Sequence, residues 1–353
     1  MKKSKRINRF IIIGSSLVLL LTSCAGSSKS ASQGTSESPT PVVVKNVLTD
    51  LPGSNGPVLA VKVDDTRPAH PQIGLESADI VYVEQVEGGL TRLAAIYSQK
   101  LPPIIGPVRS ARISDLDILA QYGRVGFAFS GAQSLFYPRI NAANLVNLSA
   151  DRNGTNVYYR DNTRFAPTNL IFRPNVIMAE TLKKNPTAID TVKPIGFTFG
   201  PMPSVGAKII SAKVNWPAAD YEITWSNADN RWHLGQDGFP DVAASGVALG
   251  GTNILIQSVS ITPSEYKDKF GGVTPFSNTV GTGTGYLLRD GRAISVNWTR
   301  PDSLSGTTWT LANGTPANLN PGQTWIMLTN TPVKFVYPAP ASPSASASAS
   351  ASK

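Results

Sequence analysis

Thiol and imidazole side chains are scarce in this chain of 353 residues, which has one cysteine and two histidines. The lone cysteine, Cys24, cannot form an internal disulfide. Two histidines without a further cysteine cannot complete a zinc site of the usual His/Cys type, and no G-x-S-x-G motif supports a Ser-His-Asp triad. We therefore predict no cofactor and no metal site, although calcium or magnesium held by carboxylates stays open.

Charged side chains are also few, at 16% of the chain. Five of the 32 lysines and arginines lie in the first nine residues, which leaves 27 to balance 23 aspartates and glutamates. After residue 9, no run of basic residues is longer than two. Surfaces that bind nucleic acid need clustered positive charge, so we expect no nucleic-acid partner.

The apolar run at residues 11–21 follows a basic N-terminus. It is too short to span a bilayer comfortably and is typical of a secretory signal peptide. Residues 21–24, Leu-Thr-Ser-Cys, resemble the bacterial lipobox, in which the chain is cut before a cysteine that then carries lipid. We predict that residues 1–23 are a signal peptide and that Cys24 carries fatty acids such as palmitate. The protein would then be anchored at the extracytoplasmic face of the cell membrane without spanning it. An ordinary cleaved signal peptide is the alternative.

Two segments of low complexity flank the core of the sequence. Residues 24–50 are predicted to be a disordered Ser/Thr/Pro tether and residues 338–353 a disordered Pro/Ala/Ser tail, because these compositions bury too little apolar surface to offset ordering entropy. Near Pro194 the composition becomes richer in Gly, Thr, Asn and Trp. We predict an α/β domain over residues 51–193 and a β-rich domain over residues 194–337.

The first half alternates between strand and helix patterns. Strands are predicted at residues 58–63, 78–86, 91–98 and 125–131. A helix is predicted at residues 112–123, with Ser114 as its N-cap and Asp117 three residues later. A second helix at residues 173–184 has Pro174 near its first position and two lysines at its end.

The second half shows strand patterns and little sign of helix. Strands are predicted at residues 252–261 and 324–330, and hairpins at residues 221–234 and 286–298. The pair Asp290-Gly291 suits a two-residue type I′ turn. Residues 281–285, Gly-Thr-Gly-Thr-Gly, are predicted to be a glycine loop, and a dinucleotide-binding fingerprint is excluded because a strand follows. The six tryptophans, all in this half, are interpreted as core and cross-strand packing, with a glycan-stacking face as the alternative.

Specific strings in both halves carry a family resemblance. They are "VKVDD" (61–65), "HPQIGLESADIVYVEQVEGGLTRLAAIYS" (70–98), "GPVRSAR" (106–112), "RFAPTNL" (164–170), "GTGTGYLLRDGRAISVNWTR" (281–300) and "GQTWIML" (322–328). Together they resemble the YerB family of bacterial lipoproteins, also called the DUF3048 family, over most of residues 50–335. The resemblance implies a YerB-like N-terminal domain and a YerB-like C-terminal domain, and it implies no particular reaction. The chain departs from the family's usual Arg-Pro-Gln, Asn and His at His70-Pro71-Gln72, Asp65 and Thr168.

The segment at residues 106–112 is the strongest candidate for a binding site. Arg109 and Arg112 are three residues apart and share one face in helical geometry, and Ser110 can bind an oxygen. With the free N–H groups at a helix start, two guanidinium groups form an anion site. The predicted ligand-binding residues are Arg109, Ser110, Arg112, Arg92, Arg164 and Asn169. The alternative is that the arginines pair internally with Asp79, Glu84, Glu87 or Asp115.

Three functions stay open, and a non-catalytic envelope protein that binds an anionic or glycan ligand, or a partner protein, near the cell wall is favoured. The second is an envelope enzyme acting on a wall polymer, with Asp65 and Glu87 as weak catalytic candidates. Asp64 and Asp65 cannot easily face one site, because adjacent residues on a strand point opposite ways. The third is a scaffold with internally paired arginines. Binding predicts an open basic pocket, catalysis adds a carboxylate facing it, and scaffolding predicts that every arginine is already paired.

Overall fold

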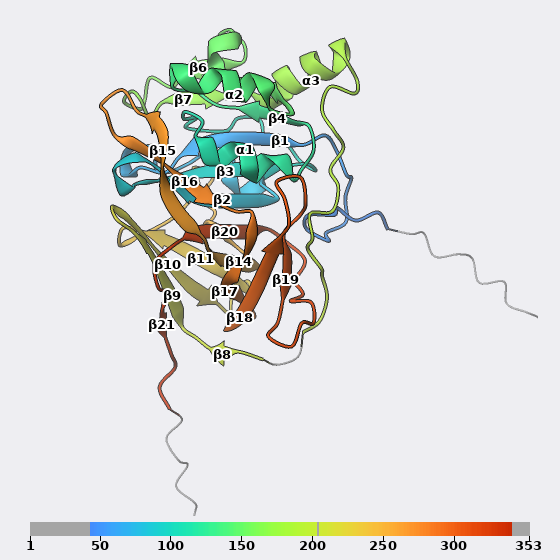
Figure 1. Cartoon of the computed structure of the whole chain (residues 1–353), viewed down its shortest axis with the longest axis vertical. Coiled ribbons are helices and arrows are strands. Elements are labelled where there is room, and N and C mark those ends of the chain that lie inside the picture. Colours follow the sequence, from blue (N-terminus) through green and yellow to red (C-terminus); the bar gives the residue numbers. More distant parts are fainter. Residues whose placement is uncertain (1–42, 203–204, 341–353) are drawn as a thin grey trace, which may run out of the picture. The chain divides into compact units, whose positions relative to one another are not determined.

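One mixed β-sheet contains strands from both halves of the sequence (Figure 1). The computed structural model describes residues 43–202 and 205–340. In spatial order the strands are β19 (Thr308–Thr310), β18 (Arg292–Arg300), β17 (Gly281–Arg289), β14 (Asn253–Ser258), β20 (Thr324–Thr329), β2 (Ile80–Gln85), β3 (Thr91–Tyr97), β1 (Leu59–Asp64), β4 (Val125–Ala128) and β5 (Leu145–Asn147), with β8 (Ala207–Lys208) on β18. β2 and β20 pair in parallel, so the two predicted domains share this sheet. The boundary between residues 193 and 194 stays a prediction.

The other regular elements of the described residues are a second sheet, two hairpins, three α-helices and five 3-10 helices of three residues each. The second sheet has the order β12 (Phe239–Pro240), β11 (Arg231–Gln236), β10 (Ala219–Ser226), β9 (Ser211–Trp216) and β21 (Lys334–Val336), with β13 (Gly250–Gly251) on β11. The hairpins are β15 (Ser260–Lys267) with β16 (Val273–Asn278), and β6 (Tyr158–Arg160) with β7 (Leu170–Phe172). The helices are α1 (Ile113–Ala120), α2 (Tyr137–Ala142) and α3 (Pro174–Lys184).

Alternating side chains divide the large sheet between two apolar cores. On β1, Ala60 packs in the core that contains Ile118 and Leu119 of α1, whereas Val61 packs in the core that contains Trp216 of the second sheet. Successive side chains of a strand point to opposite faces, so each face of β1 meets a different layer. This double coverage explains why β1 is buried along its whole length.

The predicted fold class is confirmed. All three α-helices of the described residues end before residue 185, and strands dominate the later part of the chain. The predicted hairpin at residues 286–298 is β17 and β18, which turn through Asp290 and Gly291 with φ of 52° and 67°. Positive φ at both residues is the signature of the type I′ turn that the Asp-Gly pair predicts.

The start of α1 differs from the prediction. The carboxylate of Asp115, and not that of Asp117, accepts the N–H of Arg112 at 2.6 Å, so the helix begins at Ile113. The hydroxyl of Ser114 lies inside the helix, where it accepts an N–H from hairpin β15–β16. Asp115 can cap the helix because its position, three residues after Arg112, lets its side chain reach back to the first free N–H.

The Gly-Thr-Gly-Thr-Gly segment is the start of strand β17 and not a loop. A Cβ atom on Gly285 would lie 2.2 Å from the carbonyl oxygen of Ile256 on β14, and one on Gly283 would lie 2.6 Å from the indole nitrogen of Trp298. Both glycines are therefore required by close approach of neighbouring strands, which the sequence pattern alone does not reveal.

Residues 43–50, which the composition assigns to the tether, pack against the folded body. Leu48 is fully buried, and the side-chain amide of Asn46 donates to the hydroxyl of Ser98 at 2.9 Å. Composition misses this because a single buried leucine and one polar anchor are enough to fix a short segment. The predicted signal peptide and Cys24 lie outside the described residues.

The tryptophans belong to the protein interior. Trp216, Trp232, Trp298, Trp309 and Trp325 are all buried. Trp225, which is half-buried, packs edge-on against Trp232 with ring centroids 5.1 Å apart. The core-packing interpretation is confirmed, and these rings do not form a glycan-stacking face.

Candidate functional site

Charged residues gather beside α1, where β1 and β2 end and β3 begins. Arg92 of β3 lies opposite Glu84 of β2 and opposite Asp64 of β1, so three charged residues form one row across the sheet. They point to the face that carries α1, because Ala94, two residues along β3 from Arg92, packs in the core of that face. The four cations of this cluster are Lys62, Arg92, Arg109 and Arg112. Its four carboxylates are Asp64, Glu84, Glu87 and Asp115.

Three of the four cations hold the carboxylates. The ammonium of Lys62 contacts Glu84 and lies 2.8 Å from Asp115, and all three side chains are fully buried. Burial lowers the pKa of Lys62 to about 8, although Asp115 opposes the shift. This buried triad fixes β1, β2 and the first turn of α1 to one another.

Arg109 and Arg112 each contact one carboxylate. Nε of Arg109 lies 2.9 Å from Oδ2 of Asp64, and Nε of Arg112 lies 2.7 Å from Oε1 of Glu87. Both arginines therefore have an internal carboxylate partner; Glu87 is one of the predicted partners, whereas Asp64 is not. Asp64, whose side chain is fully buried, lies behind Arg109, whose side chain is 22% exposed.

Arg92 differs from its neighbours. Only 8% of the residue is exposed, and its one hydrogen bond within the described residues runs from Nη1 to the carbonyl oxygen of Ser110 at 2.9 Å. The two carboxylates that lie opposite it in the sheet are engaged by Lys62 and Arg109. Burial, followed by the charges of Arg112 and Arg109, lowers the pKa of Arg92 to about 9. The other N–H groups of this guanidinium reach the cavity that Arg92 lines, where water or a ligand can accept hydrogen bonds from them.

A cavity of about 590 Å³ opens in front of these arginines. Its positive lining residues are Arg92, Arg109, Arg112, Lys267 and Lys269, and its negative ones are Glu87 and Asp268. The other three carboxylates of the cluster are fully buried behind the wall. Positive side chains therefore outnumber negative ones five to two at the cavity surface, although Asp64 and Glu87 are in contact with two of the arginines.

Local hydrogen bonds hold the segment at residues 106–112 across the sheet end. The N–H of Arg109 donates to the carbonyl of Lys62 at 2.9 Å, and the N–H of Ser130 donates to the carbonyl of Arg109 at 2.9 Å. The chain then enters α1, whose first residue, Ile113, lines the cavity. The opposite wall is hairpin β15–β16, which is tied down where the hydroxyl of Thr274 donates to Glu87.

The structure brings four of the six predicted binding residues together: Arg92, Arg109, Ser110 and Arg112. Arg164 and Asn169 lie elsewhere and do not line the cavity. Arg164 donates to the carbonyls of Ala69 and Pro71 at 2.9 and 2.6 Å, and Asn169 accepts a hydrogen bond from Arg160 at 2.7 Å. Each of these two side chains holds a loop, and the proposal below is argued from the other four residues.

The two weak catalytic candidates lie in different places. Glu87 lines the cavity. Burial raises the pKa of Glu87, but the hydrogen bond and charge of Arg112 outweigh burial and hold this pKa below its ordinary value. Asp65 points to the opposite face of the sheet from Asp64, as the strand geometry predicts, and accepts a hydrogen bond from the hydroxyl of Tyr221 at 2.7 Å.

Asp65 belongs to a buried cluster that joins the two halves of the chain. Nδ1 of His70 lies 3.2 Å from Asp241, and Nε2 of His70 lies 3.9 Å from Asp65. Burial raises the pKa of Asp65 to about 7, against the opposing charge of His70. Burial lowers the pKa of His70, but Asp241 raises it more strongly, so that pKa lies above its ordinary value. Within the described residues, no group of three or more His, Cys, Asp or Glu side chains is arranged to hold a metal ion.

Sequence reasoning missed Lys62 and the lysines of hairpin β15–β16. Lys62 could have been found, because it is a single charge inside the apolar run at residues 58–63 and such a charge must be paired when buried. Lys267 and Lys269 could not have been found from the sequence, because only the packing of hairpin β15–β16 against α1 brings them to the cavity that the arginines line.

The fold and the cavity define a β-rich protein in which an N-terminal mixed-sheet region and a C-terminal mostly β region share one sheet. Family models for the N-terminal and C-terminal domains of "Protein of unknown function (DUF3048)" match residues 47–187 and 212–326. The chain belongs to this family, which is also the YerB family.

Two comparisons with individual proteins agree with this assignment. A relative from Bacillus subtilis (strain 168) named "Putative lipoprotein YerB" is 48% identical over 54 residues, a match that spans 15% of this chain and 16% of that protein. The crystal structure of YerB protein from Bacillus subtilis matches with a TM-score of 0.70 and 20% identity, over 82% of this chain and 99% of that one. At this identity the structural likeness shows the fold alone. None of the helices that the structure describes has the length and apolar character needed to cross a membrane.

Proposed function

We propose that this chain is a lipid-anchored protein of the extracytoplasmic membrane face that binds an anionic group in the arginine cavity. The anchor is supported by the Leu-Thr-Ser-Cys motif at residues 21–24 and by a relative named as a lipoprotein. The binding role is supported by the geometry around Arg92, which carries the argument.

A bound anion would accept the hydrogen bonds of Arg92 that no group of the described protein accepts. The guanidinium is buried, donates to one carbonyl, and is repelled by Arg109 and Arg112. A phosphate or carboxylate oxygen in the cavity would accept from its remaining N–H groups and would lower the mutual repulsion of the three arginines. Charge-assisted hydrogen bonds of this kind are about twice as strong as neutral ones.

The size of the cavity favours an anionic group on a larger molecule over a free ion. Its volume of about 590 Å³ lies in the range of sites for organic ligands. Lys267 and Lys269, from the hairpin opposite the arginines, extend the positive lining beyond the space that one phosphate needs. The phosphodiester or carboxylate groups of a cell-wall polymer have this chemistry.

The two alternatives fit the geometry less well. Glu87 could serve as a general base only by releasing Arg112 and Thr274, which hold its carboxylate. A pure scaffold would pair every arginine of the cavity with a carboxylate, as Arg109 and Arg112 are paired. Arg92 instead donates to a backbone carbonyl.

Titration calorimetry of the full chain with poly(glycerol phosphate) tests the proposal. We expect binding that weakens by about tenfold in the variant Arg92→Met, which keeps the length of the stem and removes the donors. The matched control is Arg124→Met, since Arg124 is exposed and does not line the cavity, and it should bind like the parent. Equal binding by the parent and Arg92→Met, or no heat in the parent, would contradict the proposal.

A further inference from the structure

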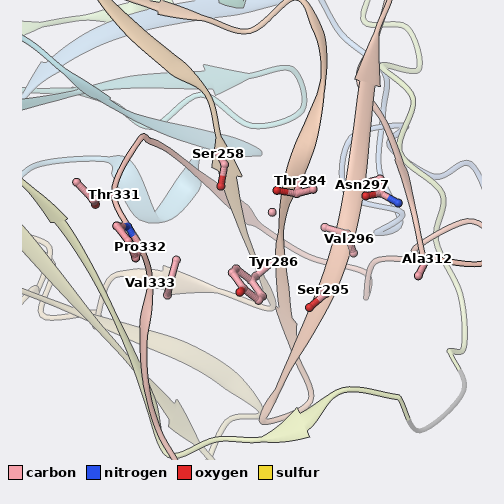
Figure 2. A pocket seen from close by; sticks show the side chains of 11 residues that line it. Ser258, Thr284, Tyr286, Ser295, Val296, Asn297, Ala312, Thr331, Pro332 and Val333 are labelled. Carbon is pink, nitrogen blue, oxygen red and sulfur yellow. The ribbon is translucent and has the colours of Figure 1, made fainter.

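A second cavity, of about 380 Å³, lies over strands β14, β17 and β18 (Figure 2). It opens on the other face of the large sheet from the arginines, because Tyr286, which lines it, packs against the core that contains the second sheet. The segment Thr331–Pro332–Val333, between β20 and β21, forms the facing wall.

Strand register places polar side chains in rows on the floor of this cavity. Thr284 of β17 lies opposite Asn297 of β18, and Tyr286 lies opposite Ser295. Ser258, at the end of β14, joins the row of Thr284 and Asn297, as Figure 2 shows. Side chains two residues apart on a strand share a face, so all of these groups point to the same side of the sheet.

The glycines of the Gly-Thr-Gly-Thr-Gly segment make this spacing possible. A side chain on Gly285 would collide with the backbone of β14. Glycine therefore lets β17 lie close to β14 and keeps Ser258 beside Thr284. The alternation with threonine then supplies a hydroxyl group at every second position of the same strand.

The chemistry of the lining is neutral and rich in hydrogen-bonding groups. None of the residues that line this cavity is an Asp, Glu, Lys, Arg or His. The residues Ser258, Thr284, Ser295 and Asn297 are exposed, and within the described residues their side chains have no hydrogen-bond partner in the protein. These groups offer donors and acceptors to a ligand with several hydroxyl groups, and they provide no counter-charge for an ionic one.

One aromatic ring stands among these polar groups. Tyr286 is held edge-on by Phe335 of β21, with ring centroids 4.9 Å apart and an interplanar angle of 75°. Its neighbours across the cavity, Pro332 and Val333, are apolar. A fixed aromatic ring flanked by apolar carbons and surrounded by hydroxyl and amide groups suits the mixed surface of a sugar ring, whose C–H face is apolar and whose edge is polar.

We propose that this cavity binds an uncharged pyranose sugar, with the ring against Tyr286 and its hydroxyl groups bonded to Thr284, Ser295 and Asn297. The proposal goes beyond the anion site, shares no residue with it, and does not depend on it. A chain that carries both sites would contact a wall polymer through a neutral sugar and an anionic group at separate places.

Titration calorimetry of the full chain with tri-N-acetylchitotriose and with maltotriose tests this proposal. We expect at least one of the two sugars to bind the parent, and its affinity to fall by about three- to tenfold in Thr284→Val, which removes one hydroxyl group without changing the shape of the side chain. Asn297→Ala should weaken binding further. Both positions are exposed, so neither variant disturbs the core.

The matched control is Thr282→Val, because Thr282 is an exposed threonine on the same face of β17, two residues before Thr284, and does not line the cavity. It should bind like the parent. Absence of binding by both sugars, or equal weakening by Thr282→Val and Thr284→Val, would overturn the proposal. Arg92→Met should leave sugar binding unchanged, which separates failure of this proposal from failure of the anion site.

Discussion

Removing the charge of Arg92 should stabilise the protein in the absence of an anion. The pKa of Arg92 is lowered from 12.5 to about 9. Each tenfold change in proton affinity corresponds to about 1.4 kcal/mol, so the charged form of Arg92 costs about 5 kcal/mol in the folded protein. Arg92→Met removes this cost and loses the hydrogen bond to Ser110, which contributes about 1.5–3 kcal/mol. The expected net gain in the free energy of unfolding is about 2–3.5 kcal/mol.

Arg112→Met should have the opposite sign. It leaves Glu87 without its ion-pair partner, and an uncompensated buried charge costs about 3–5 kcal/mol. Two arginines that line one cavity are therefore expected to shift stability in opposite directions. Urea unfolding followed by tryptophan fluorescence, in a buffer free of phosphate and sulfate, measures both changes, since most of the tryptophans are buried. If Arg92→Met lowers the free energy of unfolding by more than about 1 kcal/mol, Arg92 stabilises the folded protein through internal contacts and the reasoning is refuted.

Three further measurements test other parts of the structure. Lys62→Met should destabilise the protein by at least about 3–5 kcal/mol in urea unfolding, because it leaves two buried carboxylates unpaired, and a change below about 1 kcal/mol would contradict the buried triad. The pKa of Asp65 is raised to about 7, so between about pH 4 and pH 7 the folded state holds a proton that the unfolded state has lost, and stability should fall as the pH rises through this range. The raised pKa of His70 acts with the same sign. Asp65→Asn should flatten a plot of Tm against pH, and an unchanged slope would contradict this account. Cys24→Ala should abolish labelling by a radioactive fatty acid, and label retained by the variant would exclude the lipobox.

Local features of the fold could be predicted from the sequence. The Asp290-Gly291 turn and the proline at the start of α3 follow from backbone preferences of single residues, and both are present. The opposite directions of Asp64 and Asp65 follow from strand geometry alone. Such predictions succeed because each depends on neighbours within a few positions along the chain.

Features that depend on strand pairing across the two halves could not be predicted. β20 lies between β14 and β2, and nothing in its local sequence indicates that it joins a sheet of the first half. The carboxylate partners of Arg109 and Arg112 have no local signal for the same reason, because Asp64 comes from β1 and Glu87 follows β2. The buried contact of His70 with Asp241 joins residues from opposite halves and has no local signal.

The central claim, that the arginine cavity holds an anion on Arg92, is tested most directly by crystals of the protein soaked in selenate, whose selenium can be located by anomalous scattering. The account predicts an anomalous peak inside the cavity, within hydrogen-bond distance of the guanidinium of Arg92, and its loss in Arg92→Met crystals. Anomalous peaks confined to other parts of the surface, with the cavity filled by water alone, would contradict it.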